Sequence, residues 1–171
     1  MKKNFLLLIG FLTLMSLAGC TNINSGAKKE ITVKESVNEE KQSDDILLTL
    51  TQIVGKGDED IVKKLGKGKE ENGIVFSREY NMDVLKGNAL VTIGYNEDKV
   101  VDSVNILPND NDYDGNIELL NKVFGKYSER NDDSKESEVE DRKYCIWKLD
   151  DCTLTLMHAY GSLSVEIRKN I

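Results

Sequence analysis

The sequence predicts an α+β domain in which tandem helix-plus-three-strand repeats form one antiparallel sheet with helices on one face. Three observations predict this class. Apolar residues recur at helical spacing before two Gly-Lys junctions, at 66–67 and 125–126. After each junction, apolar and polar residues alternate with a period of two. The connections between these runs are short, which is typical of an antiparallel meander.

The first repeat, about 45–107, opens with apolar residues from Ile46 to Val54 spaced to form one face of a helix. Asp58 is a good N-cap for a second, shorter helix, which Gly66 ends. Alternation then predicts three strands, at about 74–80, 89–95 and 100–106.

The second repeat, about 115–171, has the same order of elements. An amphipathic helix at 117–124 ends at Gly125, and a charged loop covers 128–141. Three more strands are expected at 144–149, 152–158 and 163–167. Similarity between two unrelated meanders is the alternative explanation of this correspondence.

Residues 1–20 have the pattern of a bacterial export signal. Lys2 and Lys3 precede an apolar stretch that is too short for a membrane-spanning helix. The stretch closes on Leu-Ala-Gly before Cys20, and this ending resembles the lipobox of lipoproteins. The resemblance implies acylation of Cys20 and anchoring in membrane lipid on the extracytoplasmic face. An ordinary secretory peptide and an uncleaved anchor are the alternatives.

Residues 21–44 are polar and charged, which predicts a disordered tether before a globular domain at 45–171. Removal of residues 1–20 takes the formal net charge from −7 to −9. This balance argues against nucleic acid or an anionic lipid surface as the direct ligand, and it suits a cationic partner.

The lipobox, the tether and the helix–Gly–meander units resemble two small families. One is the β-lactamase-inhibitor-protein-like group, in which two such repeats share a curved sheet whose open face binds a protein. The other is the SmpA/OmlA group of envelope lipoproteins, which resembles a single unit. The likeness covers about residues 46–168 by architecture, and no contact residue carries over from it.

A sheet covered by helices on one side leaves its other face open. If Cys145 and Trp147 point inward, the alternate residues point outward and make a candidate protein-binding surface. A register shift of one residue would instead place them in the core. The predicted surface consists of Leu90, Val101, Tyr144, Ile146, Thr153, Thr155 and Met157.

The segment 110–117 resembles the start of an EF-hand calcium loop, with Asp110, Asp112 and Asp114 at alternate positions and Gly115 next. Asn121 stands where such a loop needs a bidentate carboxylate, and a strand precedes the segment. The alternative is an acidic turn in which Asp112 or Asp114 caps the next helix.

Cys145 and Cys152 are expected as two buried thiols, because a two-residue turn at 150–151 would place them roughly 13 Å apart; a disulfide between them is the alternative. His158, the one histidine, has no nucleophile in a triad-like position, which disfavours a hydrolase. The sequence therefore predicts a lipid-anchored, non-catalytic protein-binding module. The alternative is an envelope lipoprotein that responds to calcium or a small ligand.

Overall fold

The computed structural model describes residues 33–70, 76–132 and 142–170. These residues belong to one compact unit, Thr32–Ile171. They contain three helices: α1 (Val33–Gln52), α2 (Asp58–Leu65) and α3 (Tyr113–Phe124). Cys20 and the predicted signal peptide lie outside the described residues.

Helix α1 changes the predicted boundary between tether and domain. It begins at Val33, whereas the sequence predicted disorder up to residue 44. Residues 33–44 are rich in Glu, Lys and Gln, which are good helix formers, and they extend a helix whose C-terminal half is packed. The prediction for 21–32 lies outside the described residues.

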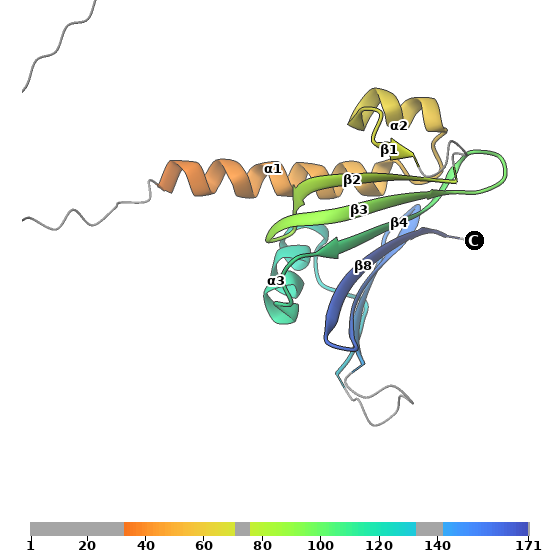
Figure 1. The fold of residues 1–171 in the computed structure, drawn as a ribbon. Helices are drawn as coiled ribbons and strands as arrows, with labels where there is room; N and C mark the ends of the chain where they lie inside the picture. The colour runs from red at the N-terminus through yellow and green to blue at the C-terminus, as the bar shows by residue number, and fades with distance from the viewer. Residues whose placement is uncertain (1–32, 71–75, 133–141, 171) are drawn as a thin grey trace, which may run out of the picture. The chain divides into compact units, whose positions relative to one another are not determined.

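All strands pair antiparallel in one eight-stranded sheet, which confirms the predicted α+β class (Figure 1). Six of them match the predicted strands, and the edge strands β1 and β5 were not predicted. The strands are β1 (Lys69–Glu70), β2 (Ser77–Val84), β3 (Gly87–Tyr95), β4 (Val101–Pro108), β5 (Glu129–Asn131), β6 (Lys143–Lys148), β7 (Cys152–Ala159) and β8 (Ser162–Lys169).

The strand order is β1-β2-β3-β4-β8-β7-β6-β5. Each edge of the sheet is a very short strand. β4 is the last strand of the first half of the chain and β8 is the last strand of the second half, and these two are neighbours in the middle of the sheet. Their ladder pairs Ser103–Ile106 with Val165–Arg168. The sheet is therefore continuous only because β4 and β8 join.

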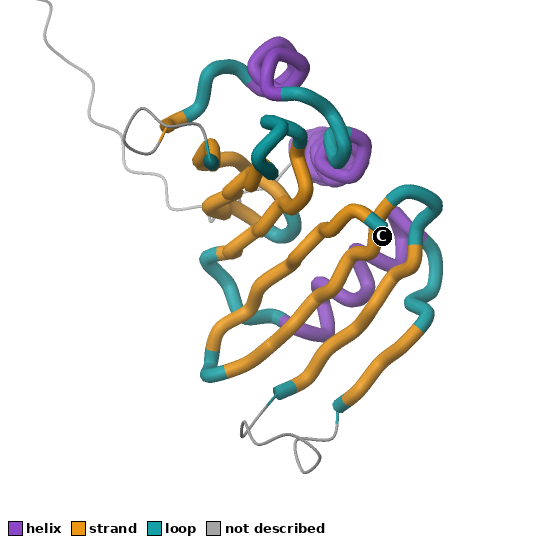
Figure 2. The backbone as a smooth tube through the Cα atoms, turned by 90° about the vertical axis from the view of Figure 1, so that its right-hand side faces the viewer, coloured by secondary structure: helices purple, strands orange, loops and turns teal. Residues whose placement is uncertain are grey.

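One side of the sheet and the helices form a single apolar core. Leu47 and Leu50 of α1 are fully buried, as are Ile53 directly after it, Ile61 of α2 and Leu120 of α3. Burial of each such side chain contributes roughly 1.5–3 kcal/mol. Figure 2 shows a helix crossing behind the strands that lead to the C-terminus, while the near face of those strands carries no helix.

Arg78 of β2 ties α2 to the sheet, although its side chain is almost completely buried. Its Nε and Nη2 donate to the two carboxylate oxygens of Asp58 at 2.6 and 2.8 Å. Its Nη1 donates to Glu70 Oε1 at 2.7 Å and to the carbonyl oxygen of Lys67 at 2.6 Å. The hydrogen bonds from Arg78 hold the pKa of Asp58 below its usual value.

Replacing Arg78 by Met should lower the free energy of unfolding by about 3–5 kcal/mol, because two carboxylates lose their buried cation. Urea unfolding followed by fluorescence of the one tryptophan, Trp147, measures this. The matched control, Lys69→Met, removes the exposed pair with Glu79 and should cost less than about 1 kcal/mol. Equal losses in the two variants would show that the Arg78 cluster does not hold α2.

The lowered pKa of Asp58 sets an acid limit on stability. Its contribution is fully present above the unfolded-state pKa, about 3.9, and is lost as pH falls through the lower folded-state pKa. Asp58→Asn should therefore reduce stability at neutral pH and flatten its decline below about pH 4. The control, Asp60→Asn in the exposed first turn of α2, should keep the wild-type slope. The urea concentration at the unfolding midpoint, measured as a function of pH for the wild type and both variants, tests this prediction.

Candidate functional site

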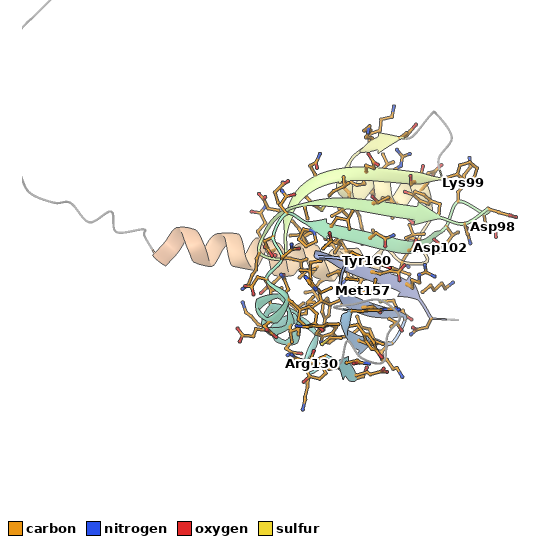
Figure 3. All side chains as sticks on the ribbon, turned by 60° about the horizontal axis from the view of Figure 1, so that its bottom comes forward. Asp98, Lys99, Asp102, Arg130, Met157 and Tyr160 are labelled. Atoms are coloured by element: carbon orange, nitrogen blue, oxygen red, sulfur yellow. The ribbon has the colours of Figure 1, made fainter. Side chains whose placement is uncertain are left out.

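The open sheet face carries the candidate binding surface. Leu90, Tyr144, Ile146, Thr153, Thr155 and Met157 are half-buried and alternate with fully buried neighbours along their strands, as the sequence predicted. Their register rules out the one-residue shift that would have placed them in the core. Met157 is labelled among the side chains of Figure 3.

Val101 does not belong to this face, so its prediction as a surface residue was wrong. A β-bulge between β3 and β4 pairs Gly94 with Ser103 but Tyr95 with Val101, which leaves Asp102 as an extra residue. The extra residue reverses the alternation at that point. Val101 therefore lies in the core with no exposed area, while Asp102 is exposed.

Beyond the bulge, Leu107 is an open-face residue that the sequence analysis missed, with 48% of its surface exposed. It lies directly opposite Leu90 in the β3–β4 ladder. Alternation from Ile106, which was expected to be buried, could have found it. A large apolar side chain exposed on a sheet face indicates a candidate binding surface.

The ladders align the outward side chains into rows that cross the strands. We call one of these the apolar row; its members are Leu90, Leu107, Met157 and Tyr144. Leu90 pairs with Leu107, and Met157 pairs with Tyr144. The β4–β8 ladder ends at Ile106 and Val165, one residue before Leu107; Ser164, the next residue of β8, pairs with Met157.

A second row, two residues along each strand, carries acidic groups. We call it the acidic row; across the sheet it reads Glu79, Thr92, Asn105, Glu166, Thr155, Ile146 and Glu129, each directly paired with the next. Glu129 Oε1 accepts a hydrogen bond from the Tyr144 hydroxyl at 2.9 Å. Arg168 donates to Glu166 at 2.7 Å, and Lys69 donates to Glu79 at 3.0 Å.

Tyr160 stands at the tip of the β7–β8 hairpin with 81% of its surface exposed. Its φ is +53°, a left-handed conformation that favours Asn or Gly at this turn position. Asn111 holds the tip, since its Nδ2 donates to the Gly161 carbonyl at 2.8 Å and its Oδ1 accepts from the Leu163 amide at 3.1 Å. The turn is thus fixed while the ring is left in solvent; Figure 3 labels Tyr160.

The calcium-like loop acts as a helix cap in this structure. Asp112 is the N-cap of α3, and its Oδ1 accepts from the Gly115 amide at 3.1 Å. Lys86 lies 2.5 Å from the other oxygen of Asp112. A Cβ at position 115 would collide with this ammonium and carboxylate, so any larger residue there would have to displace the Lys86–Asp112 pair.

The other two predicted calcium ligands also have protein partners. Asp110 accepts from the Asp112 amide at 3.0 Å, and Asp114 pairs with Arg130 at 3.2 Å. Within the described residues, no group of three or more His, Cys, Asp or Glu converges on a metal position. Calcium binding therefore stays a prediction that this geometry does not favour.

Cys145 and Cys152 are free, buried thiols. The two-residue turn at 150–151 is confirmed, with Leu149 N donating to Cys152 O at 2.9 Å. Cys145 instead faces Leu156 across the hairpin. Burial raises the pKa of both thiols, so neither is poised as a nucleophile. His158 packs edge-on against Tyr113, with ring centroids 6.3 Å apart.

A pocket of about 750 Å³ lies where α1, the β2–β3 turn and α3 meet. Val84, Leu85 and Leu119 supply its apolar lining. Ser43 fixes the turn, since its hydroxyl donates to the Leu85 carbonyl at 3.0 Å. The pocket is on the helix side and is separate from the open face.

Comparisons with known proteins give one distant structural match. No model of a known protein family matches the chain. No curated protein sequence matches it either. A solved structure of a DUF4309 family protein, YjgB from Bacillus subtilis subsp. subtilis strain 168, is similar at 12% identity with a TM-score of 0.45; the match covers 78% of this chain and 97% of that one. Among the described residues, no helix has the length and apolar character that a membrane crossing requires.

Replacing Tyr160 by Asn should raise the free energy of unfolding by about 1 kcal/mol, because Asn tolerates the left-handed turn conformation better than Tyr. Tyr160→Phe keeps the same backbone penalty and should leave stability unchanged. Urea unfolding followed by Trp147 fluorescence measures both variants. A loss of stability in Tyr160→Asn would mean that the exposed ring makes contacts that hold the hairpin.

Proposed function

We propose that this protein is a lipid-anchored, extracytoplasmic module that binds another protein through its open sheet face and performs no catalysis. The observation that carries the proposal is the apolar row, whose large side chains are left partly exposed on a sheet face that no described helix covers. Burial of such side chains is the usual driving force of protein association.

The proposed anchor is acylated Cys20, supported by the charged start, the apolar stretch and the Leu-Ala-Gly sequence before it. Twelve residues lie between this cysteine and the start of helix α1.

We also propose that the two halves are related repeats, as the likeness to the β-lactamase-inhibitor-protein-like group implies. Two matching contacts support this. Helices α2 and α3 both end at a glycine with φ near +80°, Gly66 and Gly125. The Tyr80 hydroxyl of β2 donates to the Gly66 carbonyl at 3.0 Å, and Trp147 Nε1 of β6 donates to the Gly125 carbonyl at 3.0 Å.

Site-specific photo-crosslinking in cells tests the binding function. A benzophenone amino acid replacing Ile146 in the full chain should give a defined protein adduct, because Ile146 lies in the acidic row on the open face, two residues along β6 from Tyr144 of the apolar row. The same probe at Gln52, exposed on α1, should not give that adduct. Introducing Tyr144→Lys and Met157→Lys should abolish the Ile146 adduct, since two charges would enter a buried apolar contact.

Retention of the adduct in that double variant would contradict the proposal, as would equal adducts from Ile146 and Gln52. Thermal unfolding monitored at Trp147 confirms that the variants remain folded. A Gln52→Lys variant carries a new exposed charge on the helix side and should cross-link from Ile146 as the wild type does.

A further inference from the structure

We propose that the apolar row binds an amphipathic helix of the partner whose apolar stripe is flanked by arginine or lysine. This inference rests on the proposed protein-binding function and names the chemistry of the partner segment. It follows from the direction of the row, its length and the charges beside it.

The row runs across the strands, from Leu90 on β3 to Tyr144 on β6. Neighbouring strands lie about 4.8 Å apart, which is close to the 5.4 Å pitch of an α-helix. Side chains on successive helical turns would therefore meet successive strands. An extended segment repeats its side chains on one face every 6.6 Å or so, which fits this spacing less well.

The length of the row also suits a short helix. Leu90 and Tyr144 are separated by four inter-strand steps, or about 19 Å, which a helix of about 13 residues spans. Ser164 pairs with Met157 and lies on β8, the strand between β4 and β7. Its small side chain leaves room there for a large apolar side chain of the partner. Such a helix uses anchors at i, i+3, i+4 and i+7.

The charges beside the apolar row determine which residues should flank the apolar stripe of the partner helix. The acidic row lies roughly 7 Å from the apolar row and brings Glu79, Glu166 and Glu129 beside it. In the described structure Glu129 is bound by the hydroxyl of Tyr144, whereas the other two have cationic neighbours. The whole chain carries a formal charge of −7, which also attracts a basic segment.

A synthetic peptide pair tests the inference on the full chain held in phosphatidylcholine nanodiscs. The probe is a fluorescent helix of about 14 residues with a leucine stripe flanked by arginines. Its matched control replaces each arginine by citrulline, which has the same shape and no charge. Fluorescence anisotropy measures binding, and empty nanodiscs give the background.

We expect the arginine peptide to bind and the citrulline peptide to bind about tenfold more weakly at low salt. Met157→Lys should weaken binding of the arginine peptide by a similar factor, whereas Gln52→Lys should not change it. Glu129→Gln should reduce the difference between the two peptides, because it removes one of the flanking charges.

Equal binding of the two peptides would overturn the basic flank. If Met157→Lys leaves peptide binding unchanged, the apolar row is not the binding site. If the peptide does not bind at millimolar concentration, the inference is wrong entirely. If the Ile146 adduct still forms in cells in any of these cases, the proposed binding function stands and only this partner chemistry fails.

Discussion

The pairing of β4 with β8 is the constraint on which the rest of the structure depends. It is the only ladder that connects the first four strands to the last four in the described sheet. Four residue pairs make it, from Ser103 with Arg168 to Ile106 with Val165. Val104, Ile106, Val165 and Ile167 are all fully buried, so the same short ladder also forms the centre of the core.

This ladder determines both faces of the sheet at once. Because side chains alternate, a one-residue slip would expose the buried valines and isoleucines, which the loss of apolar burial forbids. A two-residue slip would keep the core inside but would break the apolar row between Leu107 and Met157. The row on the open face is thus held in place by packing on the opposite face, and the candidate site needs no scaffold of its own.

Periodicity was enough to predict much of this arrangement. The alternation in 144–149 and 152–158, with the turn between them, indicated correctly which side chains of β6 and β7 point outward. The bulge at Tyr95 was missed, although Gly94 of β3 stands at the register shift and an isolated glycine inside a strand often marks a bulge. The glycine does not show that the extra residue, Asp102, lies on the neighbouring strand β4. The buried role of Arg78 was equally hidden, since its partners Asp58 and Glu70 come together only when α2 folds over the sheet edge.

Tyr160 illustrates where local sequence rules and the structure disagree. A tyrosine at a left-handed turn position loses stability without the compensation of burial, and Asn111 keeps that turn from relaxing. Leu85 has a similar positive φ, but its side chain is buried beneath α1, so packing offsets its strain. The backbone strain at Leu85, in the β2–β3 hairpin, is therefore offset by a side chain that packs in the core. The backbone strain at Tyr160, in the β7–β8 hairpin, has no such compensation, because its ring is in solvent. The solvent-exposed ring lies three residues beyond Met157, directly after the last residue of β7.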